Sequence, residues 1–368
     1  MRRLPIAFAI TLALIAAPAA HAAGTTASCG AGQVYTQTND PAGNQLVVLR
    51  AGRDGRLAQR QLVAAGGLGI GTHVTSGASV AVSADGCRVA IVNAGSGAIA
   101  VFRIAPGGRA TFAGSALAGG ARAISVALHG NDVAALSTTP GANTTVRTFR
   151  ATGRRVTPVP GSQQAIAGAT DGGQIAYTRN GRYLVVTTRK SLGLVTFRVD
   201  DGVPVPAEQL VPGPAHWPYG FALTPANQAI VSLADFGPPV SGAYASYAIT
   251  PAGGITEVTP PIPGQTAACW VAVAPDGRYA WGVNADAKEL VTLSVSAKGA
   301  IAATGTTTTG ESAGRDAAVS ADGRFLYLLR PDAHDILAYR IGADGGLTLI
   351  GSTPTPANAV VTAGIAAG

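Results

Sequence analysis

The chain has 368 residues, of which 47% are hydrophobic, 12% charged and 5% aromatic, with 49 glycines and a formal net charge of +7. A soluble domain normally carries about 25% charged residues, and a chain this apolar collapses rather than staying disordered. The glycines show no three-residue period, which excludes collagen, and Glu and Lys are too few for a long coiled coil. These facts predict a glycine-rich β protein that buries a substantial core.

The N-terminal residues have the pattern of a secretory signal peptide. Two arginines, at positions 2 and 3, precede an apolar run that ends near Pro18, and Ala20-His21-Ala22 supplies a small-residue cleavage site. A membrane anchor is the alternative, but the run is shorter than the roughly 20 residues of a spanning helix. We therefore predict a signal peptide over residues 1–22, a mature protein of residues 23–368 without a membrane span, and a periplasmic or secreted location.

The three cysteines of the chain, Cys29, Cys87 and Cys269, would then lie in an oxidising compartment. Their odd number allows one disulfide, for which Cys29 and Cys87 are the favoured pair. Three free buried thiols are the alternative. The spacing does not indicate a metal site, and we predict no metal or other cofactor.

A segment of about 48 residues recurs along the rest of the chain. Each copy reads as an apolar strand, an Asp-Gly or Asn-Gly turn, a second apolar strand, a polar turn and a third strand. The clearest copies begin at residues 79, 175, 270 and 318. Equivalent large apolar residues near the end of the third strand recur at steps of 46–53 residues: Leu49, Phe102, Phe149, Phe197, Tyr247, Leu293 and Tyr339. Seven such positions predict seven copies of one four-stranded unit.

Four strands in each unit and no helical period predict an all-β fold, a seven-bladed β-propeller in one domain. A right-handed β-helix is the alternative, but its repeats are shorter and would not leave a spare strand. The first strand, residues 33–38, resembles the second strand of the other units, so its blade lacks an inner strand. The tail, residues 359–366, can fill that gap. We therefore expect the N- and C-terminal strands to share one blade, which leaves no open sheet edge.

The repeat motifs resemble the lactonase-type seven-bladed propellers, a family that contains 6-phosphogluconolactonase and the carboxymuconate cyclases. The resemblance is carried by Asp276-Gly277-Arg278-Tyr279, by Asp322-Gly323-Arg324-Phe325-Leu326-Tyr327 and by Pro218-Tyr219-Gly220-Phe221, which is similar to the family's Pro-Phe-Gly-Phe. It implies a lactonase or a muconate-type cycloisomerase, which hydrolyses a small lactone or interconverts it with its hydroxy acid.

The chain departs from the family at the end of the second strand, where Glu is often found just before the turn. Here these positions read Val186-Thr187-Thr188-Arg189-Lys190 and Val231-Ser232-Leu233-Ala234. The departure leaves open a changed substrate. It also leaves open a second hypothesis, a non-catalytic exported propeller that binds a ligand or a protein partner.

Propellers bind ligands at the mouth of the central channel, where the inner strands begin. Aligning the inner strands on their turns makes six residues equivalent: Ser79, Ser125, Gln174, Gly220, Trp270 and Asp316. Opening a lactone requires a base and a group that stabilises the oxyanion. The predicted site assigns the oxyanion or carboxylate to Arg315 or Arg330, the base to Asp316 or His334, and substrate binding to His216, Tyr219, Trp270 and Gln174.

Each of these assignments has a structural alternative. Arg315 and Asp316 could form a local ion pair, Trp270 could plug the channel, and His216 could belong to an ordinary surface loop. The basic residues are scattered and not interleaved with aromatic residues, so nucleic acid is not an expected partner. A small lactone or sugar acid, bound by a monomer, is the expected ligand.

Overall fold

The computed structural model describes residues 29–189, 191, 193–210, 217–235, 240–357, 359 and 361–368. Short hairpins built on Asp-Gly or Asn-Gly turns recur in it. In each turn the Asp or Asn side chain accepts the backbone N–H two residues later, as Asp276 does from Arg278 at 3.0 Å. Gly277 follows with a φ of 73°, a conformation that favours glycine. The same bond forms at Asp85, Asn180 and Asp322.

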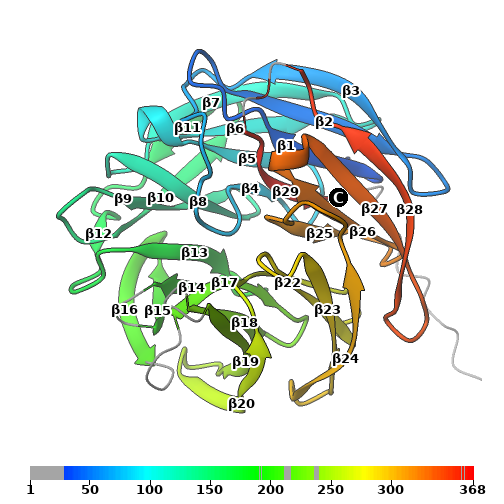
Figure 1. Cartoon of the computed structure of the whole chain (residues 1–368). Helices are drawn as coiled ribbons and strands as arrows, with labels where there is room; N and C mark the ends of the chain where they lie inside the picture. The colour runs from blue at the N-terminus through cyan, green and yellow to red at the C-terminus, as the bar shows by residue number, and fades with distance from the viewer. Residues whose placement is uncertain are drawn as a thin grey trace, which may run out of the picture.

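The hairpins assemble into seven antiparallel sheets arranged in a ring (Figure 1). From the inside outwards, blade 2 contains β4 (Val80–Val82), β5 (Arg88–Asn93), β6 (Ala98–Ile104) and β7 (Ala110–Leu117). Blade 3 contains β8 (Arg122–His129), β9 (Asp132–Thr138), β10 (Thr145–Thr152) and β11 (Arg155–Pro158). Blade 4 contains β13 (Gly172–Tyr177), β14 (Tyr183–Thr188), β15 (Gly193–Asp200) and β16 (Val203–Leu210). A short strand, β12 (Gln164–Ala165), also pairs with β10.

Blades 5 to 7 repeat the same order. Blade 5 contains β17 (Trp217–Leu223), β18 (Gln228–Asp235), β19 (Ser241–Ile249) and β20 (Ile255–Gln265). Blade 6 contains β21 (Ala268–Val273), β22 (Tyr279–Asn284), β23 (Glu289–Val295) and β24 (Ile301–Thr308). Blade 7 contains β25 (Ala317–Val319), β26 (Phe325–Arg330), β27 (Asp335–Ile341) and β28 (Leu347–Pro354). Single 3-10 turns, η1 (Ala94–Ser96) and η2 (Pro331–Ala333), join the second and third strands of blades 2 and 7.

Blade 1 is completed by both ends of the chain. It consists of β29 (Ala363–Ala367), β1 (Gln33–Gln37), β2 (Gln45–Ala51) and β3 (Leu57–Ala64), with β29 innermost. In Figure 1 the red C-terminal strand β29 lies beside the blue β1, with which it pairs antiparallel. Thr36 Oγ1 adds a 2.7 Å hydrogen bond to the carbonyl of Gly364. The predicted seven-bladed propeller and its shared blade are confirmed.

The core lies between neighbouring blades. The second strands are almost entirely buried, as in β14, whereas the outermost strands, such as β24, are mostly exposed. The seven repeat positions near the end of the third strands are each at most 1% exposed. Charged residues cannot occupy such positions without partners, which accounts for the low charge of the chain.

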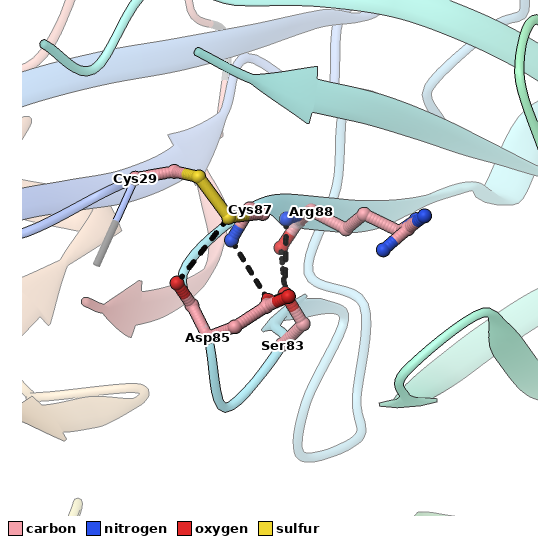
Figure 2. Close-up of a disulfide and its surroundings, with 5 residues drawn as sticks. All are labelled: Cys29, Ser83, Asp85, Cys87 and Arg88. Atoms are coloured by element: carbon pink, nitrogen blue, oxygen red, sulfur yellow. Dashed lines mark hydrogen bonds between the residues drawn. A yellow bond between two sulfur atoms is a disulfide. The ribbon is translucent and has the colours of Figure 1, made fainter. Parts of the chain in front are cut away.

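A disulfide joins Cys29 to Cys87, with a Cα–Cα distance of 4.8 Å, and confirms the predicted pair. Figure 2 shows the bridge above the turn of blade 2, where Asp85 Oδ1 accepts the backbone N–H of Cys87 at 2.9 Å. The two cysteines are 58 residues apart, and a cross-link of this span destabilises the unfolded chain by roughly 4 kcal/mol in the chain-entropy model. The bridge therefore anchors the chain just before β1 to blade 2.

Two further predictions concern the chain ends and membranes. Residues 1–22, the predicted signal peptide, lie outside the described residues. Within the part of the chain that the structure describes, none of the helices is long and apolar enough to cross a membrane.

Candidate functional site

A cavity of about 610 Å³ lies at the end of the propeller where the inner strands of blades 4 to 7 begin. The turns between second and third strands reach the same end. Its volume suits a small organic ligand. The cavity is lined by Thr75, Asp171, Arg189, Trp217, Tyr219, Val240, Ala267, Cys269, Trp270, Ala285, Asp286, Lys288, Ala313 and Arg315.

Arg189 and Asp171 form one charged wall of this cavity. Arg189 follows β14 and Asp171 precedes β13, and their side chains form an ion pair. The backbone N–H of Arg189 also donates to the carbonyl of Asp171 at 2.7 Å, which fixes the two residues relative to each other. The guanidinium lies 5.0 Å from the ring centroid of Tyr219, an arrangement that favours a cation. Arg189 is therefore held in place by two neighbours.

Tyr219 and Trp270 form an aromatic floor. Their rings meet edge to face with centroids 5.4 Å apart, and Trp270 Nε1 donates a 3.1 Å hydrogen bond to the carbonyl of Ser76. Ser76 belongs to the segment between β3 and β4, which reaches the channel mouth from blade 1. Trp270 is only 4% exposed, and it lines both this cavity and the smaller hollow beside Arg315.

Arg315, Asp332 and His73 form a second charged cluster beside the floor. Arg315 Nε and Nη2 each lie 3.4 Å from Asp332 Oδ2, and His73 Nε2 lies 3.2 Å from Asp332 Oδ1. His73 borders two smaller hollows that share Thr75 with the main cavity, one with Arg315 and one with Asp171 and Arg189. The cluster thus extends the site across the channel mouth.

The surroundings of the His73 imidazole favour its neutral form. Burial lowers its pKa below the usual 6.5, the Arg315 charge lowers it further, and Asp332 opposes both. A neutral imidazole that donates Nε2–H to Asp332 keeps the lone pair of Nδ1 available to accept a proton. His73 therefore has the protonation state of a general base.

The remaining polar groups decide the charge of the site. Lys288 and Asp286 line the rim on the turn after β22, so the cavity lining holds three cations and two carboxylates. Cys269 also lines it, but burial raises the pKa of its thiol to about 12. A thiol with this pKa is not a nucleophile at neutral pH. The lining therefore favours an anionic ligand and excludes thiolate chemistry.

Asp316 and Gln174, two of the predicted site residues, lie in the channel wall rather than the cavity lining. Asp316 is 7% exposed and accepts the backbone N–H groups of Ala317 at 2.9 Å and Ile365 at 3.2 Å. Gln174 bonds both polar groups of Phe221, donating to its carbonyl at 2.7 Å and accepting its N–H at 3.1 Å. Both side chains join neighbouring inner strands, and Arg315 pairs with Asp332 instead of Asp316.

Arg330 and His334 are not brought to the cavity. Arg330 forms a two-pronged ion pair with Asp335, at 2.9 and 2.6 Å, and donates to the carbonyl of Thr309. His334 is exposed on the turn after η2 with a φ of 52°. His216 lies outside the described residues. Of the predicted site residues, Arg315, Tyr219 and Trp270 line one cavity.

A prediction concerns the buried Asp316. Burial raises its pKa from 3.8 to about 7, so the native state keeps a proton that the unfolded chain has released between pH 4 and 7. The free energy of unfolding must therefore fall as the pH rises from 4 to 7 and stay level at higher pH. We expect Asp316→Asn to remove up to about 4 kcal/mol of this pH dependence, measured by urea unfolding at pH 4.5, 6 and 8. Equal pH slopes for both proteins would contradict the assignment.

Several residues of the site were not predicted. Arg189 belongs to the segment Val186-Thr187-Thr188-Arg189-Lys190, which lacks the Glu that the family often has there, so the departure itself was a signal. Three charged residues stand just before or after strands of the repeat, and no sequence motif marks them: Asp171, Asp286 and Lys288. His73 lies in a connecting segment outside the repeat. Among the described residues, no group of three His, Cys, Asp or Glu side chains is placed to hold a metal ion.

Comparison with known proteins agrees with this architecture. Residues 243–362 match the family "Lactonase, 7-bladed beta-propeller", which confirms the resemblance seen in the repeat motifs. The matched part contains Cys269, Trp270, Asp286, Lys288 and Arg315 of the cavity lining. No curated protein matches the chain significantly.

Solved structures share the fold at low identity. The periplasmic gluconolactonase of Pseudomonas aeruginosa has 14% identity and a TM-score of 0.71, over 90% of this chain and 98% of that one. A candidate 6-phosphogluconolactonase of Bacteroides uniformis has 16% identity and a TM-score of 0.72, over 90% and 99%. The hydrazine synthase of Kuenenia stuttgartiensis, at 12% identity, a TM-score of 0.59 and coverage of 78% and 88%, is also similar. The fold alone therefore does not define an activity.

Proposed function

We propose, from the lactonase-family match and the geometry of the cavity, that this propeller hydrolyses a small anionic lactone to its hydroxy acid. The observation that carries the proposal is the convergence of Arg189 and Arg315 on one aromatic-floored cavity, next to two smaller hollows that His73 borders. Both guanidinium groups act on the Tyr219 phenol, where they oppose the rise of its pKa caused by burial. They also line the same cavity, where both can contact one bound molecule.

The proposed reaction uses residues of blades 4 and 7 and of one connecting segment. His73 Nδ1 takes a proton from water, and the hydroxide adds to the lactone carbonyl carbon. One arginine stabilises the oxyanion that forms and the other holds a carboxylate or phosphate of the substrate. The ring C–O bond then breaks, and the ring oxygen recovers the proton from His73. The product is a hydroxy acid and no group is oxidised or reduced.

Arg315 is the better candidate for the oxyanion. Its ion pair with Asp332 is long, at 3.4 Å, and its side chain is 32% exposed. Arg189 is already fixed by Asp171 and Tyr219, which suits a residue that positions a permanent charge. Trp217, Tyr219 and Trp270 would contact the apolar faces of the ring.

A binding protein without catalysis is the second candidate. It is favoured by the absence of the family's Glu from residues 186–190, which removes a carboxylate, and by Arg189 in the same segment, which strengthens anion binding. Export is part of both candidates, because the disulfide fits an oxidising compartment and the N-terminal sequence fits a signal peptide. We place the protein in the periplasm or outside the cell.

A lactone panel tests the proposal. The purified protein is assayed against aldonolactones, with and without a 6-phosphate, and muconolactones, and acid release is followed in a pH-stat after subtraction of spontaneous hydrolysis. We expect turnover of at least one lactone and a loss of roughly 100-fold in kcat/KM for Arg315→Gln, since one oxyanion donor is removed.

The matched control is Arg324→Gln. Arg324 follows β25 whereas Arg315 precedes it, and Arg324 pairs with Asp322 in an exposed turn. The control should keep full activity. Binding of a lactone or hydroxy acid without turnover would establish the second candidate instead, and equal losses in both variants would rule out the assigned cavity.

A further inference from the structure

A second, larger hollow of about 670 Å³ lies between blades 1 and 2, away from the cavity described above. It lies against the end of β2, the beginning of β3 and the turn between β6 and β7. The hollow therefore lies at the end of the propeller opposite the channel mouth. The hollow is lined by Gln33, Arg50, Arg60, Gln61, Gly107, Gly108 and Arg109.

The lining contains three arginines and no carboxylate. Among the residues that the structure describes, Arg50, Arg60 and Arg109 do not form an ion pair. Only 12% of the residues of the chain are charged, yet three cations share this hollow. Their mutual electrostatic repulsion is unfavourable, and a bound anion would offset it. The chemistry of the lining therefore selects a negatively charged ligand.

The walls of the hollow are fixed by two buried or half-buried glutamines. Gln61 donates to the carbonyl of Ala110 at 2.8 Å and accepts its N–H at 3.0 Å, which ties β3 of blade 1 to the turn of blade 2. Gln33 is 3% exposed. With its amide oriented to satisfy both atoms, it donates to the carbonyl of Leu49 at 2.9 Å and accepts from Arg50 Nη1 at 3.1 Å. Arg50 is thus oriented by a buried side chain.

Gly108 keeps the floor of the hollow open. Its φ is 86°, and a Cβ there would come within 2.1 Å of the side-chain amide of Gln33. Any other residue would displace the glutamine that orients Arg50. The turn thus brings Arg109 toward Arg50 and Arg60 without filling the space between them.

A neighbouring hollow extends the positive charge. It lies on the other side of the same turn and is lined in part by Arg88 and Arg103. These two residues are direct partners in the β5–β6 register, and like charges in that position destabilise a sheet. The carboxylate of Asp85 offsets the positive charge of Arg88.

We propose that the hollow lined by Arg50, Arg60 and Arg109 binds a phosphate group, as free phosphate or as the phosphate ester of a small molecule. Guanidinium groups match the geometry of phosphate oxygens by paired hydrogen bonds, and the hollow is large enough for a phosphorylated sugar. The site is independent of the proposed hydrolysis, because it shares no residue with the channel mouth.

Isothermal titration calorimetry with inorganic phosphate and with glucose 6-phosphate, at constant ionic strength in chloride, tests the site. We expect one-to-one binding that the Arg50→Gln/Arg109→Gln variant weakens at least tenfold. The two probes separate the ligand sources, since tighter binding of glucose 6-phosphate identifies an ester. Arg60→Gln gives a second variant, and melting curves without ligand confirm that the variants fold.

Two controls keep the result specific. Arg154→Gln/Arg155→Gln removes two exposed arginines from blade 3 and should leave the affinity unchanged. Arg315→Gln tests for phosphate held at the channel mouth instead, and it should not remove the binding that Arg50→Gln/Arg109→Gln weakens. Absence of binding, equal weakening by the blade 3 control, or loss of binding only in Arg315→Gln would overturn the proposal.

Discussion

His73→Asn should lower kcat on the best lactone by about 100-fold or more, with little change in KM. General bases contribute factors of roughly 10²–10⁴, and asparagine cannot take up the proton of water. The substrate would still be held by Arg189 and Arg315, so binding should persist. Initial rates over a range of lactone concentrations, in the pH-stat, separate kcat from KM.

The pH profile gives a sharper test of the same residue. Wild-type kcat/KM should fall on the acid side with a midpoint below 6.5, because the buried imidazole beside Arg315 has a lowered pKa. Arg315→Gln removes the charge that lowers this pKa, so its midpoint should move to higher pH. Asp332→Asn removes the charge that raises it, so its midpoint should move to lower pH.

These opposite shifts distinguish a base from a structural residue. The other charged groups around His73 are Arg122, Asp171 and Arg189, which border the same hollow and are unchanged in both variants. A catalytic His73 requires shifts of opposite sign. An acid limb that stays in place in both variants, or full activity in His73→Asn, would assign the proton transfer to another group.

The order of the blades could be predicted from the sequence because one hairpin is repeated. Each Asp-Gly or Asn-Gly turn is a local structure, and in the four blades that have one the buried third-strand residue follows it at the same distance, as Phe102 follows Asp85 and Tyr339 follows Asp322. Even the spare strand could be placed, since residues 33–38 matched a second strand rather than a first. Local rules that recur seven times leave few alternative folds.

The site could be predicted only where it follows the repeat. Trp270 stands at an aligned inner-strand position, Tyr219 and Arg315 stand one residue before theirs, and all three line the cavity. Arg330 was assigned to the site from its charge, but it is the register partner of Asp335 across a hairpin. Opposite charges facing each other on neighbouring strands pair, so this position was predictable as an ion pair.

His73 shows the limit of the repeat argument. The step from Leu49 to Phe102 is the longest of the series, and the structure explains it by the connection between β3 and β4 that reaches the channel mouth. The extra length was visible, but its path depends on contacts with blades 6 and 7, such as Trp270 with Ser76 and Asp332 with His73. Contacts between distant segments carry no local pattern.

Deleting residues 363–368 should cause the largest loss of stability. The deletion removes β29, the inner strand of blade 1, with the buried Ile365 and the hydrogen bonds to β1. Burial of one such side chain contributes roughly 1.5–3 kcal/mol and each hydrogen bond roughly 0.5–1.5 kcal/mol, against a total stability of roughly 5–15 kcal/mol. We expect the Tm to fall by about 10 °C or more, measured by circular dichroism.

A matched pair of substitutions isolates the closing strand. Ile365 is 4% exposed in β29, and Leu349 is 56% exposed in the outermost strand of blade 7. Ile365→Ala should cost about 2–5 kcal/mol, whereas Leu349→Ala should change the free energy of unfolding by no more than about 0.5 kcal/mol.

Restoring the strand completes the argument. A peptide of residues 361–368 added to the truncated protein should pair with the exposed edge of β1 and raise the Tm again, because main-chain hydrogen bonds recognise an open sheet edge. If the truncated and full-length proteins unfold at the same temperature, the ring does not depend on β29. In that case the disulfide from Cys29 to Cys87, which remains in the truncated protein, would be sufficient to hold blade 1 against blade 2.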